Sequence, residues 1–215
     1  MRYTVIDTGE SRSFPADHPL VAGASPEGEV AILIGRDAGA RLAALAGRAS
    51  KRAVLVELGT ECLGVYTGER RGEEGSNVLG FARFRLGSAP PTNLVELVRQ
   101  PRTAETALAA ARAVLEGAGL ATALCGDVPG RILNRLLRPY FNEALRRLDE
   151  GLASAADMDT TLRLGLGYPE GPIALLERTG LADHCDVTQA LYEALGDRAY
   201  APARRARIAK LRGEP

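Results

Sequence analysis

The chain has 215 residues, of which 46% are hydrophobic and 25% are charged, a composition typical of a globular protein with a sizeable core. Lys plus Arg and Asp plus Glu number 27 each, so charge gives no reason to expect nucleic acid or an anionic membrane as a partner. No apolar run approaches the ~20 residues that span a bilayer, and the N-terminus lacks a secretion signal. We therefore expect a cytoplasmic protein.

The first 126 residues alternate short apolar runs with glycine-rich breaks. Gly39–Arg48 is predicted to be a helix, and Thr103–Gly117 a second one with Thr103 as its N-cap. The charged, glycine-rich segment Gly64–Ser76 is predicted to be an exposed loop. Strands that alternate with helices favour a mostly parallel, covered sheet. The predicted strands are Tyr3–Ile6, Val30–Ile34, Ala53–Leu58, Val78–Phe84 and Thr122–Cys125.

The residues from 127 onward indicate consecutive helices. Asp127 is predicted to cap the first, whose apolar residues recur in pairs every four positions. Pro139 should kink this helix and free a backbone carbonyl near Arg135. Further along, Ser154 and Asp157 resemble a capping box. The predicted later helices run from Ser154 to Gly165 or Gly167, from Pro172 to Gly180, over Asp183–Leu195 and over Pro202–Leu211.

Cysteine and histidine, the usual zinc ligands, are scarce and scattered. The chain holds Cys62, Cys125, Cys185, His18 and His184. A structural zinc site needs about four such ligands at close spacing. His184 does stand between Asp183 and Cys185, but neighbours in sequence point in different directions on a helix. A partly solvated helix face is the favoured interpretation there, and we expect no metal.

A long segment at the start of the helical part carries a family resemblance. Residues 126–144 read GDVPGRILNRLLRPYFNEA, which resembles the D-x-P-G-F-x-x-N-R-L-L-x-P-Y-x-N-E-A signature of the C-terminal domain of 3-hydroxyacyl-CoA dehydrogenases. The likeness extends over about 78–211. It implies an α/β, truncated Rossmann-like remnant at 1–126, followed by an all-α dimerisation domain of the 3-hydroxyacyl-CoA dehydrogenase type at 127–215.

The family's chemistry indicates which residues matter. Its members oxidise the 3-hydroxyl of an acyl-CoA by hydride transfer to NAD. A histidine takes the proton, a glutamate orients that histidine, and an asparagine and a serine bind the reacting oxygen. The histidine's segment, G-x-H-F-F-N-P, resembles GFARFRL here, which puts Ala82 at the base. Arg83 cannot substitute, because a guanidinium stays protonated. By the same resemblance the glutamate survives as Glu96 and the asparagine as Asn134, whereas Glu61 stands at the serine position.

The cofactor motif is also absent. A dinucleotide fold needs G-x-G-x-x-G between its first strand and helix, because the pyrophosphate binds backbone N–H groups there. After Ile6 the chain reads DTGESRSF, and residues 34–39, IGRDAG, miss the spacing. We therefore expect no NAD site and interpret the first domain as a Rossmann remnant kept as a scaffold. The chain resembles the second, degraded copy of this unit that some longer family members carry.

The retained polar residues have two interpretations each. Asn134 is either a substrate-binding remnant or a structural residue that satisfies the carbonyl freed by Pro139 or braces two helices. Glu96 is either a catalytic remnant or an exposed strand or turn carboxylate. Arg131, Arg135 and Arg138 lie three to four residues apart. They either meet the phosphates of coenzyme A or form an ordinary solvated helix face.

Two functions therefore stay open. The first is a protein of acyl-CoA metabolism, of fatty or aromatic acids, that lacks an independent NAD-dependent dehydrogenase activity. The second is a non-catalytic dimerisation or acyl-CoA-binding module that partners a full-length dehydrogenase. In both, the resemblance implies a homodimer through the helical domain and an acyl-CoA ligand.

Overall fold

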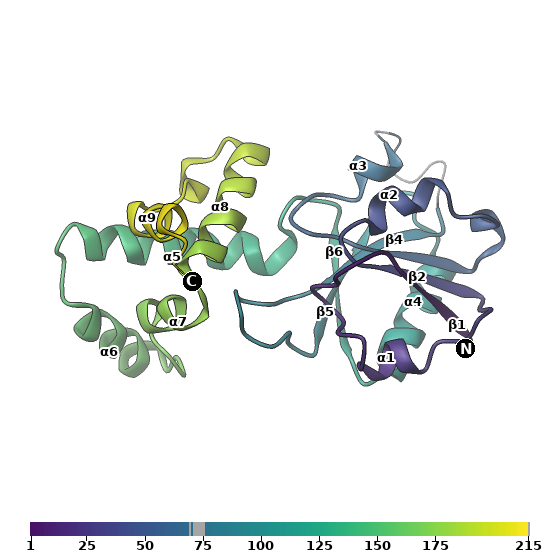
Figure 1. The fold of residues 1–215 in the computed structure, drawn as a ribbon, viewed down its shortest axis with the longest axis horizontal. Helices are drawn as coiled ribbons and strands as arrows, with labels where there is room; N and C mark the ends of the chain where they lie inside the picture. Colours follow the sequence, from purple (N-terminus) through teal and green to yellow (C-terminus); the bar gives the residue numbers. More distant parts are fainter. Residues whose placement is uncertain (69, 71–75, 215) are drawn as a thin grey trace. The chain divides into compact units, whose positions relative to one another are not determined.

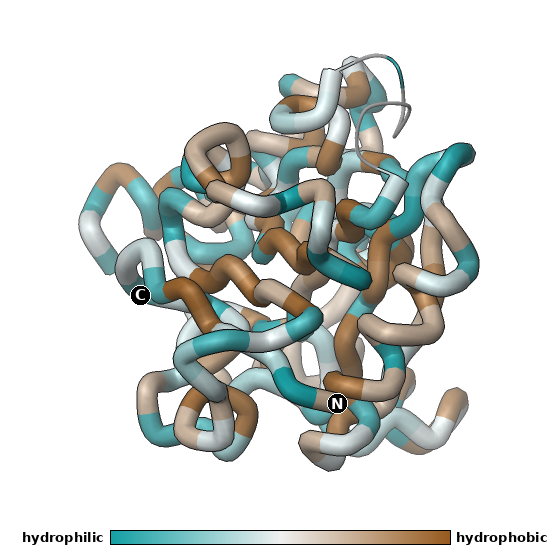
Figure 2. The backbone as a smooth tube through the Cα atoms, turned by 90° about the vertical axis from the view of Figure 1, so that its right-hand side faces the viewer, coloured by the Kyte–Doolittle hydropathy of each residue, from teal (hydrophilic) through white to brown (hydrophobic). Residues whose placement is uncertain are grey.

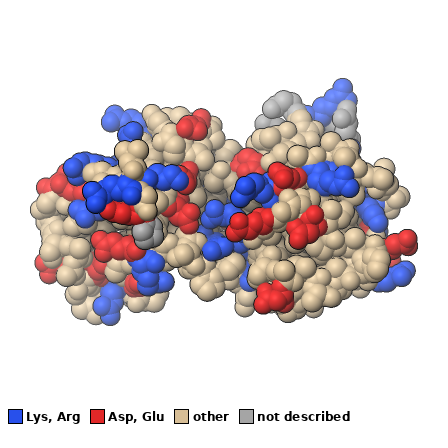
Figure 3. Space-filling model, in the orientation of Figure 1, with Lys and Arg blue, Asp and Glu red and all other residues tan. Residues whose placement is uncertain are grey.

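The computed structural model describes residues 1–68, 70 and 76–214, and it divides into two compact units (Figure 1). The sheet unit comprises Met1–Arg85 and Pro91–Ile132, and the helical unit comprises Leu86–Pro90 and Leu133–Pro215. Acidic and basic side chains are interspersed over the face drawn in Figure 3, in keeping with their equal numbers. Among the residues described, no helix has the length and apolarity needed to cross a membrane.

The sheet unit contains a six-stranded mixed sheet whose strands lie in chain order. All neighbouring strands are parallel except β4 and β5. The five predicted strands are confirmed to within two residues. The remaining strand, Leu94–Arg99, was not predicted, because Glu96 interrupts its apolar pattern. The strands are β1 (Tyr3–Asp7), β2 (Val30–Ile34), β3 (Ala53–Glu57), β4 (Val78–Arg83), β5 (Leu94–Arg99) and β6 (Ala121–Gly126).

Helices cover both faces of this sheet. The long helix α4 (Glu105–Gly117) packs with Phe14 and Leu20 on one face, over apolar residues of β2 to β5. The short helices α2 (Ala38–Ala43) and α3 (Gly64–Thr67) lie on the other. Figure 2 colours the most apolar stretches of the strands brown. Side chains that alternate along each strand therefore enter two separate cores.

Three local predictions in this unit need correction. Thr103 does not cap α4, because its Oγ1 accepts a hydrogen bond from the N–H of Gln100 at 2.9 Å. The helix predicted at Gly39–Arg48 ends at Ala43, and a separate 3₁₀ turn, η1 (Arg48–Ser50), follows. The predicted loop at 64–76 begins with α3, and its residues 69 and 71–75 lie outside the described part of the chain. A one-turn helix, α1 (Pro19–Ala22), precedes β2.

The helical unit confirms the predicted series of helices. Ser154 Oγ accepts from the N–H of Asp157 and donates to Asp157 Oδ2, so Ser154 caps α6 as predicted, and the helix ends before Gly167. The third helix ends before Gly180, also as predicted. The helices are α5 (Arg131–Asp149), α6 (Ala155–Leu166), α7 (Pro172–Thr179), α8 (Leu181–Leu195) and α9 (Arg204–Arg212), with a 3₁₀ turn, η2 (Arg198–Tyr200), before α9.

Pro139 frees the carbonyl of Arg135, as predicted, because proline has no N–H to donate four residues back. The hydroxyl of Tyr200 donates to that carbonyl at 3.1 Å, and Tyr200 is 5% exposed. A phenol from η2 therefore supplies the hydrogen bond that the helix lacks. Asn134, which the sequence suggested for this role, does not fill it.

The turn before α7 has a structural role. Asp159 accepts hydrogen bonds from the N–H groups of Ile173 and Ala174, each at 2.9 Å, and so caps α7. A Cβ on Gly171 would lie 2.2 Å from the Asp159 side chain. Glycine is therefore required at this position for α6 and α7 to approach each other.

Candidate functional site

The position of the family's catalytic histidine, held here by Ala82, lies opposite the glutamate that would orient that histidine. Strands β4 and β5 are antiparallel, and their register pairs Ala82 with Glu96. Directly opposed residues of an antiparallel pair share one face of the sheet, with Cβ atoms about 5 Å apart. Glu96 is 1% exposed, so its interpretation as an exposed carboxylate was wrong. The structure thus brings together the two positions that the sequence comparison had paired.

Glu96 has partners that do not involve a base. Its Oε1 accepts a hydrogen bond from the N–H of Ile132 at 2.8 Å, in the first turn of α5. Its Oε2 lies 3.5 Å from Nε of Arg131, and both side chains are at most 3% exposed. A carboxylate at a helix N-terminus is stabilised by the unpaired N–H groups and the helix dipole. Glu96 therefore caps α5, the role that the sequence had predicted for Asp127.

Arg131 is buried, so it does not lie on a solvated helix face. It stands where the family signature has phenylalanine, and it adopts a φ of 53°, which is uncommon for a residue with a side chain. Its Nη2 donates to the carbonyl of Gly59, while Nε and Nη1 have no hydrogen-bond acceptor among the described residues. Its guanidinium is thus on the same face of the sheet as Ala82 and faces the Glu96 carboxylate.

Asp127 joins two other elements instead of capping α5. Its Oδ1 accepts from the N–H of Leu63 at 2.6 Å, and its Oδ2 accepts from the N–H of Gly64 and from Nε2 of Gln100, both at 2.8 Å. These N–H groups open helix α3. The signature aspartate therefore fixes the segment after β3 to the end of β6.

Glu61, at the position of the family's serine, is engaged by its own neighbours. Its Oε1 accepts from the N–H of Gly59 at 3.0 Å and from the hydroxyl of Tyr66 at 3.1 Å. Burial, followed by the charge of Glu61, raises the pKa of Tyr66 to about 12.

Burial, followed by the charge of Glu96, raises the pKa of Cys125 to about 11. Tyr66 and Cys125 are therefore protonated at neutral pH.

A second buried carboxylate, which sequence reasoning missed, closes the carboxyl-end edge of the parallel strands. Glu57 ends β3 and is 7% exposed. Its oxygens accept from the N–H of Gly35 at 2.6 Å, the N–H of Ser13 at 2.8 Å and the hydroxyl of Ser11 at 2.7 Å. Gly35 follows β2, and the two serines follow β1. Parallel α/β sheets bind phosphates at this edge, through backbone N–H groups. Here an internal carboxylate uses those groups.

Two further contacts hold the same loops. Gly35 has a φ of +102°, and a Cβ there would lie 2.5 Å from the carbonyl oxygen of Gly9, so the segments after β1 and β2 touch through backbone. Arg83, buried at the end of β4, donates from Nη1 to the carbonyl of Ser13 at 2.9 Å and from Nε to that of Thr92 at 2.7 Å. The edge is therefore closed by backbone and side-chain contacts within the unit.

The other predicted site residues belong to the helical unit. Asn134 Oδ1 accepts from Nε of Arg138 at 3.0 Å, and Arg138 is 1% exposed. Arg138 also contacts His184, which is fully buried, so the prediction of a partly solvated helix face at His184 was wrong. Of the three arginines proposed for coenzyme A, only Arg135 is partly exposed. Its predicted role in binding phosphate is not tested by these contacts.

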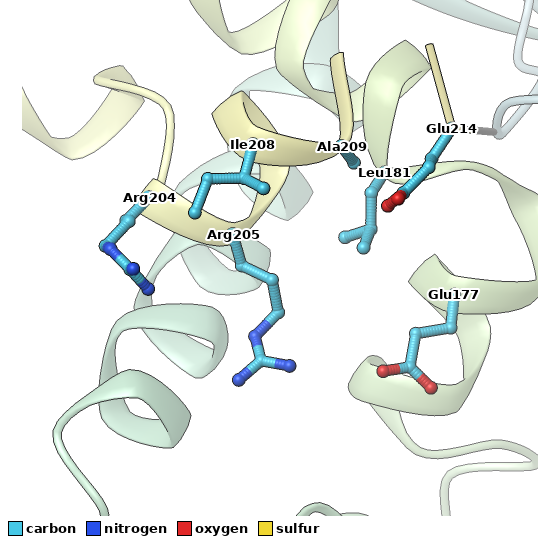
Figure 4. A pocket seen from close by; sticks show the side chains of 7 residues that line it. All are labelled: Glu177, Leu181, Arg204, Arg205, Ile208, Ala209 and Glu214. Carbon is cyan, nitrogen blue, oxygen red and sulfur yellow. The ribbon is translucent and has the colours of Figure 1, made fainter. Parts of the chain in front are cut away.

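A surface cavity of about 330 Å³ lies between α7, α8 and α9 (Figure 4). Arg204 and Arg205 line it together with Glu177 and Glu214, so the lining carries no net charge that would favour an anion. Arg205 is also paired with Asp149. We therefore assign the cavity no ligand. Over the described residues, no group of three His, Cys, Asp or Glu side chains has the geometry to hold a metal.

The two units define a class of protein: a mixed, partly parallel α/β sheet linked to an all-α unit that starts with a long helix containing Pro139. Residues 130–211 match the family model of the 3-hydroxyacyl-CoA dehydrogenase C-terminal domain. This part of the chain is therefore a 3-hydroxyacyl-CoA dehydrogenase C-terminal domain, and the chain is related to that family through it.

Individual relatives agree with that relationship. The chain is 44% identical over 92 residues to the mitochondrial hydroxyacyl-coenzyme A dehydrogenase of Sus scrofa, a match that covers 43% of this chain and 29% of the relative. It is 33% identical over 117 residues to the 3-hydroxybutyryl-CoA dehydrogenase of Bradyrhizobium diazoefficiens, covering 54% and 40%. The crystal structure of (S)-3-hydroxybutyryl-CoA dehydrogenase from Ralstonia eutropha superposes with a TM-score of 0.69 at 26% identity, over 86% of this chain and 66% of that one. The chain spans less than half the length of these two curated relatives.

Proposed function

We propose that the chain is a 3-hydroxyacyl-CoA dehydrogenase-related protein of acyl-CoA metabolism, of fatty or aromatic acids, without NAD-dependent dehydrogenase activity of its own. The observation that carries this proposal is the set of contacts of Glu96. The side chain opposite it is the methyl group of Ala82, and its carboxylate is engaged by Arg131 and a helix N-terminus. A methyl group cannot take a proton, and loss of a general base alone costs about 10²–10⁴ in rate.

Three described groups of the sheet unit that could exchange a proton, on His18, Tyr66 and Cys125, do not serve as that base. The only histidine in its sequence, His18, uses Nδ1 to accept from the N–H of Leu20 at 3.1 Å, and so caps α1. Burial and the nearby Arg83 lower the pKa of His18. Tyr66 and Cys125 keep their protons at neutral pH. None of these three groups therefore replaces the missing base.

The family's cofactor does not fit the residues present. The strands lie in chain order, so the parallel part has no point where strand order reverses, which is where doubly wound sheets bind dinucleotides. The backbone N–H groups at the carboxyl-end edge already donate to Glu57. A pyrophosphate would have to displace this carboxylate and would be repelled by its charge. We therefore derive no reaction step that uses NAD.

Calorimetric titration with acetoacetyl-CoA, with and without NADH, tests the proposal. We expect any acyl-CoA affinity to be the same in both titrations. Micromolar binding that tightens with NADH would refute the proposal. The Ala82→His variant provides a second test, because it restores an imidazole opposite Glu96. It should reduce acetoacetyl-CoA no faster than the wild-type chain, because the backbone N–H groups that would bind the pyrophosphate of NAD still donate to Glu57.

A second candidate function, a non-catalytic dimerisation module, is supported by the surface of α6. None of its residues is buried, and Leu164 and Leu166 are 80% and 62% exposed. Large apolar side chains left exposed on a helix favour a protein interface. In this candidate the helical unit forms a homodimer or joins a full-length dehydrogenase of the family.

Light scattering after size-exclusion chromatography tests this candidate. Leu164→Glu/Leu166→Glu should convert a dimer into a monomer without changing the far-ultraviolet spectrum. Val65→Glu, at a residue of the sheet unit that is 65% exposed, is the matched control and should leave the mass unchanged. A monomeric wild-type chain at tens of micromolar would exclude the homodimer.

A further inference from the structure

The helical unit contains a chain of buried hydrogen bonds that ends at Asn134. Arg138, in the middle of α5, places Nε 3.0 Å from Oδ1 of Asn134 and Nη1 2.9 Å from Nδ1 of His184. Nε2 of His184 is 3.0 Å from Oδ1 of Asn142, whose Nδ2 is 3.1 Å from the carbonyl of Ala199. Arg138, His184 and Asn142 are each at most 1% exposed.

The donor in every link of this chain follows from chemistry. A guanidinium only donates, so Nδ1 of His184 accepts from Arg138 and the imidazole proton sits on Nε2. That proton is donated to Oδ1 of Asn142, which leaves Nδ2 of Asn142 to donate to the carbonyl of Ala199, a group that can only accept. The directions worked out from both ends agree. Burial, followed by the charge of Arg138, lowers the pKa of His184 to about 3, so the ring is neutral at physiological pH.

The consequence for Asn134 is a fixed amide. Its Oδ1 faces the donor of Arg138, so its Nδ2 must point away from the buried chain of hydrogen bonds. Among the residues that the structure describes, Nδ2 has no hydrogen-bond acceptor within reach, and Asn134 is partly exposed. An isolated asparagine can turn its amide by 180°, but this one cannot do so without setting N–H against N–H.

We propose that Arg138, held by His184 and Asn142, is a positioning residue that fixes the side-chain amide of Asn134 with its N–H₂ outward, to donate to a carbonyl oxygen of a ligand. An outward N–H₂ recognises an oxygen acceptor such as a ketone or thioester, and it does not recognise a cation. The proposal rests on the proposed function only for the class of ligand, an acyl-CoA that carries a 3-oxo group. The orientation of the amide is independent of it.

Side-chain resonances in ¹H–¹⁵N spectra test the orientation. We expect the His184 proton on Nε2, and Asn134 N–H₂ signals, assigned by their loss in Asn134→Asp, that move toward the values of a free amide in Arg138→Met. Arg147→Met is the matched control: Arg147 is an exposed arginine of the same helix, paired with Glu143 and Glu150. A proton on Nδ1 of His184, or unchanged Asn134 signals in Arg138→Met, would overturn the proposal. His184→Gln, which keeps an acceptor for Arg138, should leave the Asn134 signals in place and covers the case in which Arg138→Met fails to fold.

Calorimetry with acetoacetyl-CoA and with coenzyme A alone tests the ligand. The wild-type chain should prefer acetoacetyl-CoA by roughly two- to tenfold, the value of one net hydrogen bond. Asn134→Asp keeps an oxygen for Arg138 but loses the outward N–H, so it should lose this preference, as should Arg138→Met, while Arg147→Met retains it. If Asn134→Asp keeps the preference, or if the wild-type chain has none, the carbonyl ligand is refuted. Neither result depends on NADH, so failure here is distinct from failure of the proposed function.

Discussion

Acid should destabilise the helical unit through His184. The ring is fully buried, and its pKa falls from an ordinary 6.5 to about 3, first because of burial and then because of Arg138. A group whose folded pKa is depressed contributes stability above its unfolded pKa and loses it as pH falls toward the folded pKa. The window of loss therefore runs from about pH 6.5 down to about pH 3. With these two values, linkage gives a loss of about 2 kcal/mol between pH 7.5 and pH 5 and about 4 kcal/mol by pH 3.5.

Two measurements check this. The chain has only two histidines, so the imidazole C–H signals are assigned by the His18→Asn variant, in which asparagine can still cap α1. The His184 signal should not titrate between pH 8 and pH 5. Denaturant unfolding at pH 7.5 and pH 5 should show about 2 kcal/mol more acid sensitivity in the wild-type chain than in His184→Gln. Glutamine can accept from Arg138 but takes up no proton, so the difference isolates the ring from the carboxylates that titrate in the same range.

A His184 signal that titrates near pH 6.5 would refute the reasoning, because it would mean that the ring is solvated or that the folded unit tolerates its charge. Equal acid sensitivity in the wild-type chain and His184→Gln would do the same. The direction of the hydrogen bonds around Asn134 would then be lost too, because a charged ring cannot accept from Arg138.

Three further predictions concern single buried contacts. Arg131→Met should lower the free energy of unfolding by about 3 kcal/mol, because it removes the buried guanidinium from the Glu96 carboxylate. In a denaturant titration, the double variant Arg131→Met/Glu96→Leu should recover most of that loss. Additive losses from the two substitutions would contradict this. Tyr200→Phe should cost about 1–2 kcal/mol in thermal unfolding, since the carbonyl of Arg135 loses the hydroxyl donor, and an unchanged midpoint would count against that bond. Glu57→Gln should cost about 1–3 kcal/mol and speed amide exchange in the loops after β1 and β2, whereas unchanged exchange would show that the carboxylate does not hold them.

The sequence predicts the helical unit well because its signals are local. The cap at Ser154, the stop at Gly180 and the carbonyl freed by Pro139 each depend on residues within one or two helical turns. What it could not identify is the partner that satisfies a freed group. Tyr200 reaches the carbonyl of Arg135 from 65 residues away. No pattern within a helical turn contains that information.

The sheet unit shows the same limit at its charged residues. Glu96 broke the apolar pattern that would have predicted β5, although the strand is real and its other central residues are buried. The pattern assumes that a buried face is apolar, and it fails where a buried carboxylate has its own cation. Glu57 carried a usable signal, an acid that ends an otherwise apolar strand. Its three donors come from segments 22 to 46 residues away, which only the fold brings together.

Both altered regions of the sheet unit share one physical feature, a carboxylate satisfied from within the chain. An enzyme keeps N–H groups and a charged side chain ready for ligand, and such unsatisfied groups cost stability. Here Glu57 takes the donors at the strand ends, and Glu96 takes Arg131 and the first turn of α5. Each arrangement stabilises the unit without a ligand and opposes an incoming anion or base. Because the two carboxylates act at different places, restoring an imidazole at Ala82 corrects neither of them. The proposed function therefore predicts that dehydrogenase activity appears only when the strand-end donors and the helix cap are changed together.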